Sequence, residues 1–353
     1  MNLCISRLDH IKFDSNSFEI ISSDKVKELN MDGAIVGVGA EFLVYDKDAM
    51  VLVKNSELRL LMGEYMYQAL IRKPMMLFLI PTQEDEFDGT KEFFDKIYGS
   101  KTIMLNNFAQ AFSIACWFIK DSCVSAAYIY WLNLINGYYS QAVRHMNPML
   151  SDGTIAETSF SNDEMQEALA RMFEVYRYVL PDDARTGSVN MTVSEGTVVW
   201  EIDKAMSTEG TSFARALILL QEARRTGVLS SRIDKYCSVL ECLYAINSAH
   251  KKNISQITAA YIGQDSSERE TIVLDMRDAY GVRSDGSHGE NLKYLRDNDQ
   301  EALANLSRKL DDYVRRVFRK VIANDTLNYN SADDSKAEVR AYFRTIMQSV
   351  YPE

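Results

Sequence analysis

The pattern of hydrophobic and polar positions predicts strands and helices mixed together in the first two hundred residues. Short apolar runs bounded by turn residues are typical of strands, and they occur at 34–39, 41–45, 50–53, 75–81 and 197–202. Helical spacing of apolar residues predicts helices at 101–144 and 156–180, and a turn-rich stretch covers 182–196. We therefore expect a mixed α/β domain over residues 1–205.

Beyond residue 205 the pattern is helical throughout. Apolar residues recur at every third and fourth position and form one stripe, which contains Ile233, Cys237, Leu240, Leu243 and Ile246. The same periodicity predicts helices at 212–225, 303–321 and 336–350. Four or more helices joined by short loops predict an antiparallel bundle. The expected fold class is α+β, with an all-α bundle over residues 206–353.

A capping motif and a polar loop divide the middle of this bundle. Ser267-Glu-Arg-Glu270 has the spacing of a capping box, with Ser267 as the N-cap and Glu270 reaching back to it. The helix that it opens is predicted to end near Arg283, and residues 284–287 are predicted to form a loop before the long closing helix.

The charge is distributed unevenly between these two parts. The whole chain has 39 Lys and Arg against 50 Asp and Glu, a net charge of −11. Residues 207–325 hold 18 against 17, a net of +1, so the remainder holds 21 against 33, a net of −12. This balance argues against broad coating of nucleic acid. Any contact with a polyanion is expected in the C-terminal part, through a local pocket.

The cysteines, the histidines and the most apolar stretches indicate which class of protein this is. Five cysteines and four histidines show no spacing typical of a structural zinc site, so we expect no metal and no cofactor. The most apolar stretch, 109–135, is interrupted by Lys120 and Asp121, and the first fifteen residues lack the apolar core of a signal peptide. We expect a cytoplasmic protein with buried, reduced cysteines.

The candidate chemistry lies in Tyr280-Gly-Val-Arg-Ser-Asp-Gly-Ser-His-Gly289. Arg283 and His288 bracket the predicted loop, and Ser284 and Asp285 inside it are auxiliary candidates. Imidazole transfers protons near neutral pH, and a guanidinium fork matches phosphate oxygens. Such a pair suffices for metal-free RNA cleavage, in which a 2′-hydroxyl attacks the adjacent phosphate. The spacing alone also fits an arginine that caps a helix and a histidine that binds a loop carbonyl.

The surrounding residues resemble the Apea-like HEPN family over about residues 207–325. The matching phrases are Leu240-Glu-Cys-Leu243, Tyr280-Gly-Val-Arg-Ser284 and His288-Gly289, followed by a long closing helix. Ser287 departs from the family, whose members often carry an apolar residue before His-Gly. The resemblance implies a metal-independent endoribonuclease that acts as a homodimer, with two Arg–His loops facing a composite cleft. It also implies a role in antiviral (phage) defence or as a toxin.

Several alternatives stay open at this point. The same fold also serves as a non-catalytic HEPN module for dimerisation or RNA binding, and the N-terminal half could house a small-molecule enzyme. We interpret that half as a sensor or regulator of unknown trigger, a protein or a small molecule. Glu241 either orients Arg283 through a buried ion pair or pairs with another basic residue. The aromatic stretch between Trp117 and Tyr139 either stacks bases or forms core or dimer interface.

Overall fold

The computed structural model describes residues 2–14, 18–21, 35–39, 58–71, 74–80, 91–133, 139–143, 147–179, 192–194, 197–199, 211–287, 289–297, 299–329 and 333–352. The chain divides into two compact units, Met1–Asn147 with Ala156–Asn190 and Pro148–Ile155 with Met191–Glu353. The fold is mixed α+β. The boundary that we predicted at residue 205, and the strands predicted at 41–45 and 50–53, lie outside the described residues.

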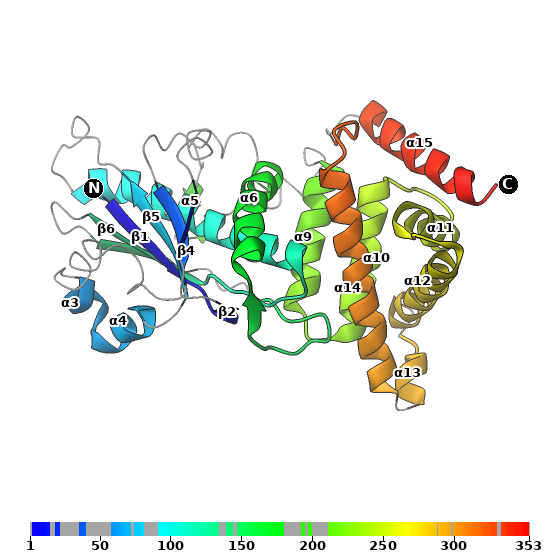
Figure 1. Cartoon of the computed structure of the whole chain (residues 1–353), viewed down its shortest axis with the longest axis horizontal. Helices are drawn as coiled ribbons and strands as arrows, with labels where there is room; N and C mark the ends of the chain where they lie inside the picture. Colours follow the sequence, from blue (N-terminus) through cyan, green and yellow to red (C-terminus); the bar gives the residue numbers. More distant parts are fainter. Residues whose placement is uncertain are drawn as a thin grey trace. The chain divides into compact units, whose positions relative to one another are not determined.

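A six-stranded sheet forms the centre of the first unit (Figure 1). Its strands run in the order β3 (Phe18–Ile21), β4 (Ile35–Gly39), β5 (Met75–Ile80), β1 (Asn2–Arg7), β6 (Tyr128–Asn133) and β7 (Tyr139–Val143). All neighbours pair antiparallel, and Cys4 of β1 lies opposite both Phe78 and Trp131. The sheet confirms the predicted strands at 34–39 and 75–81.

Helices and short strands complete this unit. The helices are α3 (Leu58–Met62), α4 (Glu64–Ile71), α5 (Lys91–Ile119) and α6 (Asn162–Val179), and α5 packs against α6. Strand β2 (Ile11–Phe13) pairs in parallel with β8 (Thr158–Phe160). Our prediction of helix throughout 101–144 is wrong, because α5 ends at Ile119 and two strands follow. The run Tyr-Ile-Tyr-Trp-Leu in β6 is rich in aromatic and β-branched side chains, which favour strands.

The aromatic stretch belongs to the core of the first unit where it is described. Trp117 and Phe118 on α5 and Trp131 on β6 have side chains that are 0% exposed. Their rings therefore are not available to stack on bases, and they contribute apolar burial to the sheet and its covering helix. Of this stretch, Tyr138 lies outside the described residues.

The second unit is a helical assembly with one small hairpin, β9 (Thr192–Ser194) with β10 (Thr197–Val199). Its helices are α9 (Ser212–Arg225), α10 (Leu229–Tyr244), α11 (His250–Ile262), α12 (Ser266–Ser287), α13 (Lys293–Arg296), α14 (Gln300–Ile322) and α15 (Asp333–Val350). Helix α10 contacts α9, α12 and α14 (Figure 1). Its predicted apolar stripe is confirmed over four residues that are each 0% exposed, Ile233, Cys237, Leu240 and Leu243.

A short segment distant in sequence completes this unit. The side chain of Arg232 on α10 is 0% exposed, and its guanidinium donates to the carbonyls of Leu150 and Thr226. Ser307 on α14 donates to the Ser151 carbonyl at 2.5 Å, and Arg308 binds Asp152 at 3.1 Å. Because these contacts satisfy buried polar groups, residues 148–155 are an integral part of the second unit.

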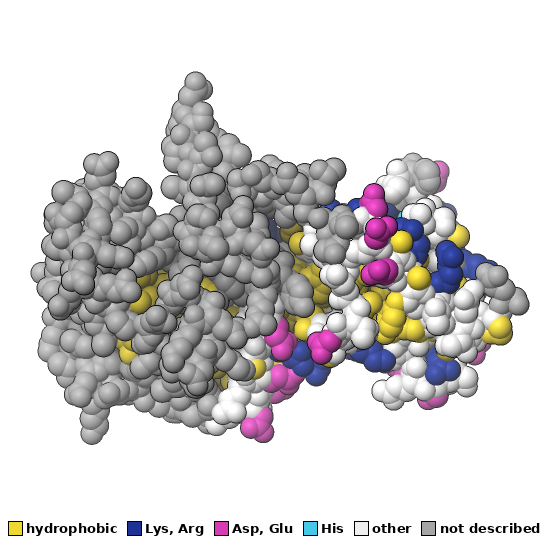
Figure 2. Space-filling view, turned by 90° about the horizontal axis from the view of Figure 1, so that it is seen from above, with side chains coloured by type: hydrophobic (Ala, Val, Ile, Leu, Met, Phe, Trp, Pro, Cys, Tyr) yellow, Lys and Arg dark blue, Asp and Glu magenta, His cyan; other side chains and the backbone are white. Residues whose placement is uncertain are grey.

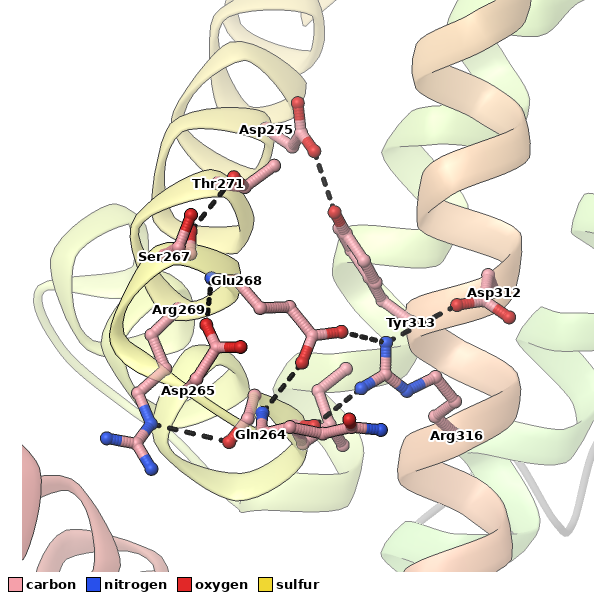
Figure 3. Close-up of polar contacts among 12 residues, drawn as sticks. Gln264, Asp265, Ser267, Glu268, Arg269, Thr271, Asp275, Asp312, Tyr313 and Arg316 are labelled. Atoms are coloured by element: carbon pink, nitrogen blue, oxygen red, sulfur yellow. Dashed lines mark hydrogen bonds and ion pairs between the residues drawn. The ribbon is translucent and has the colours of Figure 1, made fainter.

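The N-terminus of α12 is capped by Asp265 and Glu268 (Figure 3). Asp265 Oδ1 accepts the Glu268 backbone N–H at 2.9 Å, and Glu268 Oε2 accepts the Gln264 N–H at 2.6 Å. The other oxygen of Glu268 accepts from Arg316 on α14 at 2.8 Å. Our capping box at Ser267 is therefore wrong by two residues. Asp265 precedes the first helical residue, Ser266, and supplies the side-chain acceptor that a helix start requires.

The cysteines and the helix lengths bear on the class of protein. All five cysteines are free, and four of them are buried while Cys242 is partly exposed. Among the helices that the structure describes, none has the length and apolar character needed to cross a membrane.

Candidate functional site

Two helices bring Arg283 against a pair of carboxylates. Asp234 and Glu241 are seven residues apart on α10, which places them on one face two turns apart. Arg283 on α12 faces them, with its Nε 2.9 Å from Asp234 Oδ1 and its Nη1 2.5 Å from Glu241 Oε1. Of the two roles open to Glu241, the structure therefore shows the ion pair with Arg283.

Glu241 gathers two further side chains. Its Oε1 accepts a hydrogen bond from the Tyr280 hydroxyl at 2.8 Å, and Tyr280 lies one turn before Arg283 on α12. The Nδ1 atom of His250, the first residue of α11, lies 3.2 Å from the same oxygen. We call these five residues, Asp234, Glu241, His250, Tyr280 and Arg283, the Glu241 cluster.

The electrostatics of the Glu241 cluster keep Arg283 charged. Partial burial alone would lower the pKa of Arg283, but Glu241 and then Asp234 outweigh it, and the pKa is raised. Burial raises the pKa of Tyr280 far above its usual range, with Cys237 and Glu241 adding to the effect. Tyr280 is thus a neutral hydrogen-bond donor to Glu241 at neutral pH. The cluster presents a fixed cation beside two carboxylates.

Arg283 retains access to solvent. Its side chain is 28% exposed, compared with 17% for Glu241. The printed ion-pair contacts of Arg283 are made through Nε and Nη1. A guanidinium held through Nε and Nη1 can still present its remaining nitrogen to a phosphate oxygen.

Our prediction of a loop at residues 284–287 is wrong. Helix α12 continues to Ser287, so Arg283, Ser284 and Asp285 all lie within the helix. The chain leaves the helix at Gly289, two residues beyond Ser287, where φ is 68°. The Gly289 N–H donates to the Gly286 carbonyl at 3.4 Å and the Glu290 N–H to the Asp285 carbonyl at 2.9 Å. This is a Schellman motif, in which glycine supplies the left-handed residue.

The sequence candidates are therefore only partly brought together. Arg283 and Glu241 are in contact, whereas Ser284 is exposed and the Asp285 carboxylate accepts from the Lys293 backbone N–H at 3.4 Å. His288 lies outside the described residues. A Cβ on Gly286 or Gly289 would meet nothing within 4 Å, so Gly289 serves to end the helix. It is not required there by a close approach of another group.

Three members of the Glu241 cluster were not candidates in the sequence analysis: Asp234, His250 and Tyr280, which appeared there only within a matching phrase. Asp234 was detectable, because a residue two turns before Glu241 shares its helix face. His250 was not, because its position depends on how the chain turns between α10 and α11. In the described parts of the chain, no group of three or more His, Cys, Asp and Glu side chains is arranged to hold a metal ion.

Comparison of the chain with protein-family models, with curated proteins and with solved structures gives no match.

Proposed function

We propose that the chain is a metal-independent endoribonuclease of the HEPN type, with Arg283 and His288 as its catalytic pair. The observation that carries this proposal is the fixed and partly exposed guanidinium of Arg283. A ribonuclease that uses no metal needs a permanent cation at the scissile phosphate, because the transition state gains negative charge there. His288 supplies a group that exchanges protons near neutral pH.

The surface of the second unit fits a local contact with RNA. In Figure 2, Lys and Arg side chains of its described part are interspersed with Asp and Glu side chains. A mixed surface of this kind does not bind a phosphate backbone over a long track. We propose that RNA contacts a small region around Arg283, and that two copies of the chain combine their sites in a cytoplasmic homodimer. The biological role that we propose is an antiviral or toxin effector.

A second candidate function is a non-catalytic HEPN module for dimerisation or RNA binding. It is favoured by the double engagement of Arg283, because Asp234 and Glu241 compete with phosphate for the guanidinium. Two carboxylates also repel an approaching phosphate. A module that uses Arg283 only to join α10 to α12 would show the same contacts.

The deciding experiment is incubation of the purified full-length chain with RNA in the presence of EDTA. The proposal expects cleavage that survives chelation and leaves 2′,3′-cyclic phosphate ends. Arg283→Ala should abolish it, whereas Arg277→Ala, an exposed position on the same helix, should not. RNA binding or dimerisation without any cleavage would select the non-catalytic module.

The first unit, with its surrounding acidic sequence, is proposed to regulate the nuclease. The sequence outside residues 207–325 holds the net charge of −12 that follows from 21 basic against 33 acidic residues. An acidic sequence of this kind repels RNA and suits a protein or small-molecule trigger better than an RNA platform. The test is the cleavage assay with RNA of increasing concentration and with cell extract as a source of the trigger.

A further inference from the structure

The side chain of His250 is partly buried beside Glu241. Its Nδ1 atom is buried, has no hydrogen-bond partner among the described residues, and lies 3.2 Å from Glu241 Oε1. The side chain as a whole is 42% exposed. The exposed area therefore lies on side-chain atoms other than Nδ1.

The turn that delivers His250 has an uncommon backbone. Ala245 and Ala249, which bracket it, have φ values of 52° and 47°. Non-glycine residues rarely adopt this left-handed conformation, and where they do the surrounding structure must hold them there. Arg340 on α15 does so at one end, since its Nε donates to the Ala245 carbonyl at 2.8 Å. The consequence of this turn is that α11 begins beside Glu241.

Cleavage of RNA by its own 2′-hydroxyl needs two proton transfers. A base takes the proton of the 2′-hydroxyl as the 2′-oxygen bonds to phosphorus. An acid then gives a proton to the 5′-oxygen as the bond from phosphorus to that oxygen breaks. The proposed pair of Arg283 and His288 gives each chain one cation and one imidazole, so a base and an acid from the same chain require a second proton-transfer group beside Arg283.

We infer that His250 is the general base of this reaction, taking the 2′-hydroxyl proton on Nε2 while His288 protonates the leaving oxygen. This inference rests on the proposed ribonuclease function. The carboxylate of Glu241 stabilises the imidazolium that forms, in the way that a buried carboxylate supports a catalytic histidine. The same carboxylate fixes Arg283, so one residue sets the distance between the base and the phosphate clamp.

The other charged or titratable groups of the Glu241 cluster and of the turn before α11 belong to three neighbouring elements. Glu241 and Asp234 lie on α10, Tyr280 and Arg283 on α12, and Arg340 on α15 binds the turn. On α11 itself, Lys251 and Lys252 are exposed. Glu241 is the group in direct contact, and it is shared with Arg283 and Tyr280.

The test is the pH dependence of RNA cleavage in EDTA by the full-length chain and by His250→Asn. The Asn amide nitrogen occupies the place of Nδ1 and preserves the contact with Glu241, but it cannot accept a proton. We expect kcat to fall about 10²–10⁴-fold with KM nearly unchanged. Wild-type activity should rise with pH as the base loses its proton, and the variant should lack this acid limb. Lys252→Gln, a change at an exposed neighbouring position, should keep the wild-type kcat and the acid limb of the pH profile.

The outcomes separate the two proposals. A wild-type chain that does not cut RNA, either alone or with cell extract as a source of the trigger, overturns the ribonuclease function and this inference together. An active wild type with a fully active His250→Asn overturns the inference alone. A slow variant that retains the acid limb also overturns it, because His250 then only positions Glu241. If the variant melts at a lower temperature, the same profile is measured below that temperature. Loss of folded protein scales the whole profile, whereas loss of a base removes one limb.

Discussion

Replacing Arg283 with lysine tests whether geometry or charge matters at the proposed site. The arginine contacts Asp234 through Nε and Glu241 through Nη1. Lysine keeps the positive charge, but its single nitrogen cannot bind both carboxylates and a phosphate oxygen in the planar arrangement of a guanidinium. We therefore expect Arg283→Lys to be nearly as damaging to cleavage as Arg283→Ala.

The magnitudes follow from the exposure of the pair. An exposed ion pair contributes about 0.2–1 kcal/mol, and breaking a buried one costs about 3–5 kcal/mol. Arg283 is 28% exposed and Glu241 17%, and lysine keeps one of the two contacts. The free energy of unfolding should therefore fall by only about 1 kcal/mol. Loss of one donor to transition-state charge costs about 10²–10³-fold in kcat, so activity should fall far more than stability.

The assay compares kcat/KM for RNA cleavage with the thermal unfolding midpoint for wild type, Arg283→Lys and Arg283→Ala. Arg277→Lys is the matched control, since Arg277 is exposed on the same helix. A lysine variant with close to wild-type kcat/KM would show that charge alone suffices, and the geometric argument would then be refuted. A fall in activity explained by a matching loss of folded protein would refute it too.

Four further expectations can be checked on the full-length chain. His288→Ala should reduce cleavage about 10²–10⁴-fold without lowering the melting temperature, and a variant that cuts at the full rate would remove His288 from the site. Light scattering at micromolar concentration should show a dimer or an assembly of dimers, and a fully active monomer would contradict the composite cleft. Arg232→Met should lower the free energy of unfolding by about 3 kcal/mol, because it leaves the partly buried carbonyls of Leu150 and Thr226 without their donor; a change below about 1 kcal/mol in urea unfolding would contradict this. The Gln264 N–H and then Arg316 lower the pKa of Glu268. The charged Glu268 carboxylate therefore contributes to the free energy of unfolding above its unfolded pKa of about 4.3, and this contribution is lost as the pH falls through the lower pKa of the folded state. The deficit of Glu268→Gln, about 0.5–2 kcal/mol at neutral pH, should therefore shrink in acid, and a deficit independent of pH would show that the carboxylate charge is not involved.

The sequence alone determined the helices whose partners are near in the chain. The predicted segment 212–225 is α9, and the stripe from Ile233 to Leu243 is the buried face of α10. A strong amphipathic period fixes both the type of element and the face that it buries. The sequence also offered Arg283 as one of the possible partners of Glu241, and only the structure shows that the two are in contact.

Only the tertiary structure decided the strands β1 and β6. The residues of β1, Asn2 to Ser6, are buried without alternation, since the strand lies at the centre of the sheet between β5 and β6. A run that is buried on both faces carries no period of two for a sequence pattern to detect. The aromatic residues of β6 suit a helix and a strand equally by hydrophobicity, and the edge offered by β1 settled the choice.

Tertiary structure also decided the segments that long-range polar contacts recruit. Residues 148–155 join the second unit because Arg232 and Ser307 bind their carbonyls. His250 reaches Glu241 because two alanines adopt left-handed conformations. Helix α12 runs past the predicted loop because Gly289, and not the polar run before it, is where the backbone turns left-handed. The physical reason is common to all three. Hydrophobic periodicity is a local property of the chain, whereas a buried hydrogen bond or a strained turn is stabilised by groups that the sequence does not place side by side.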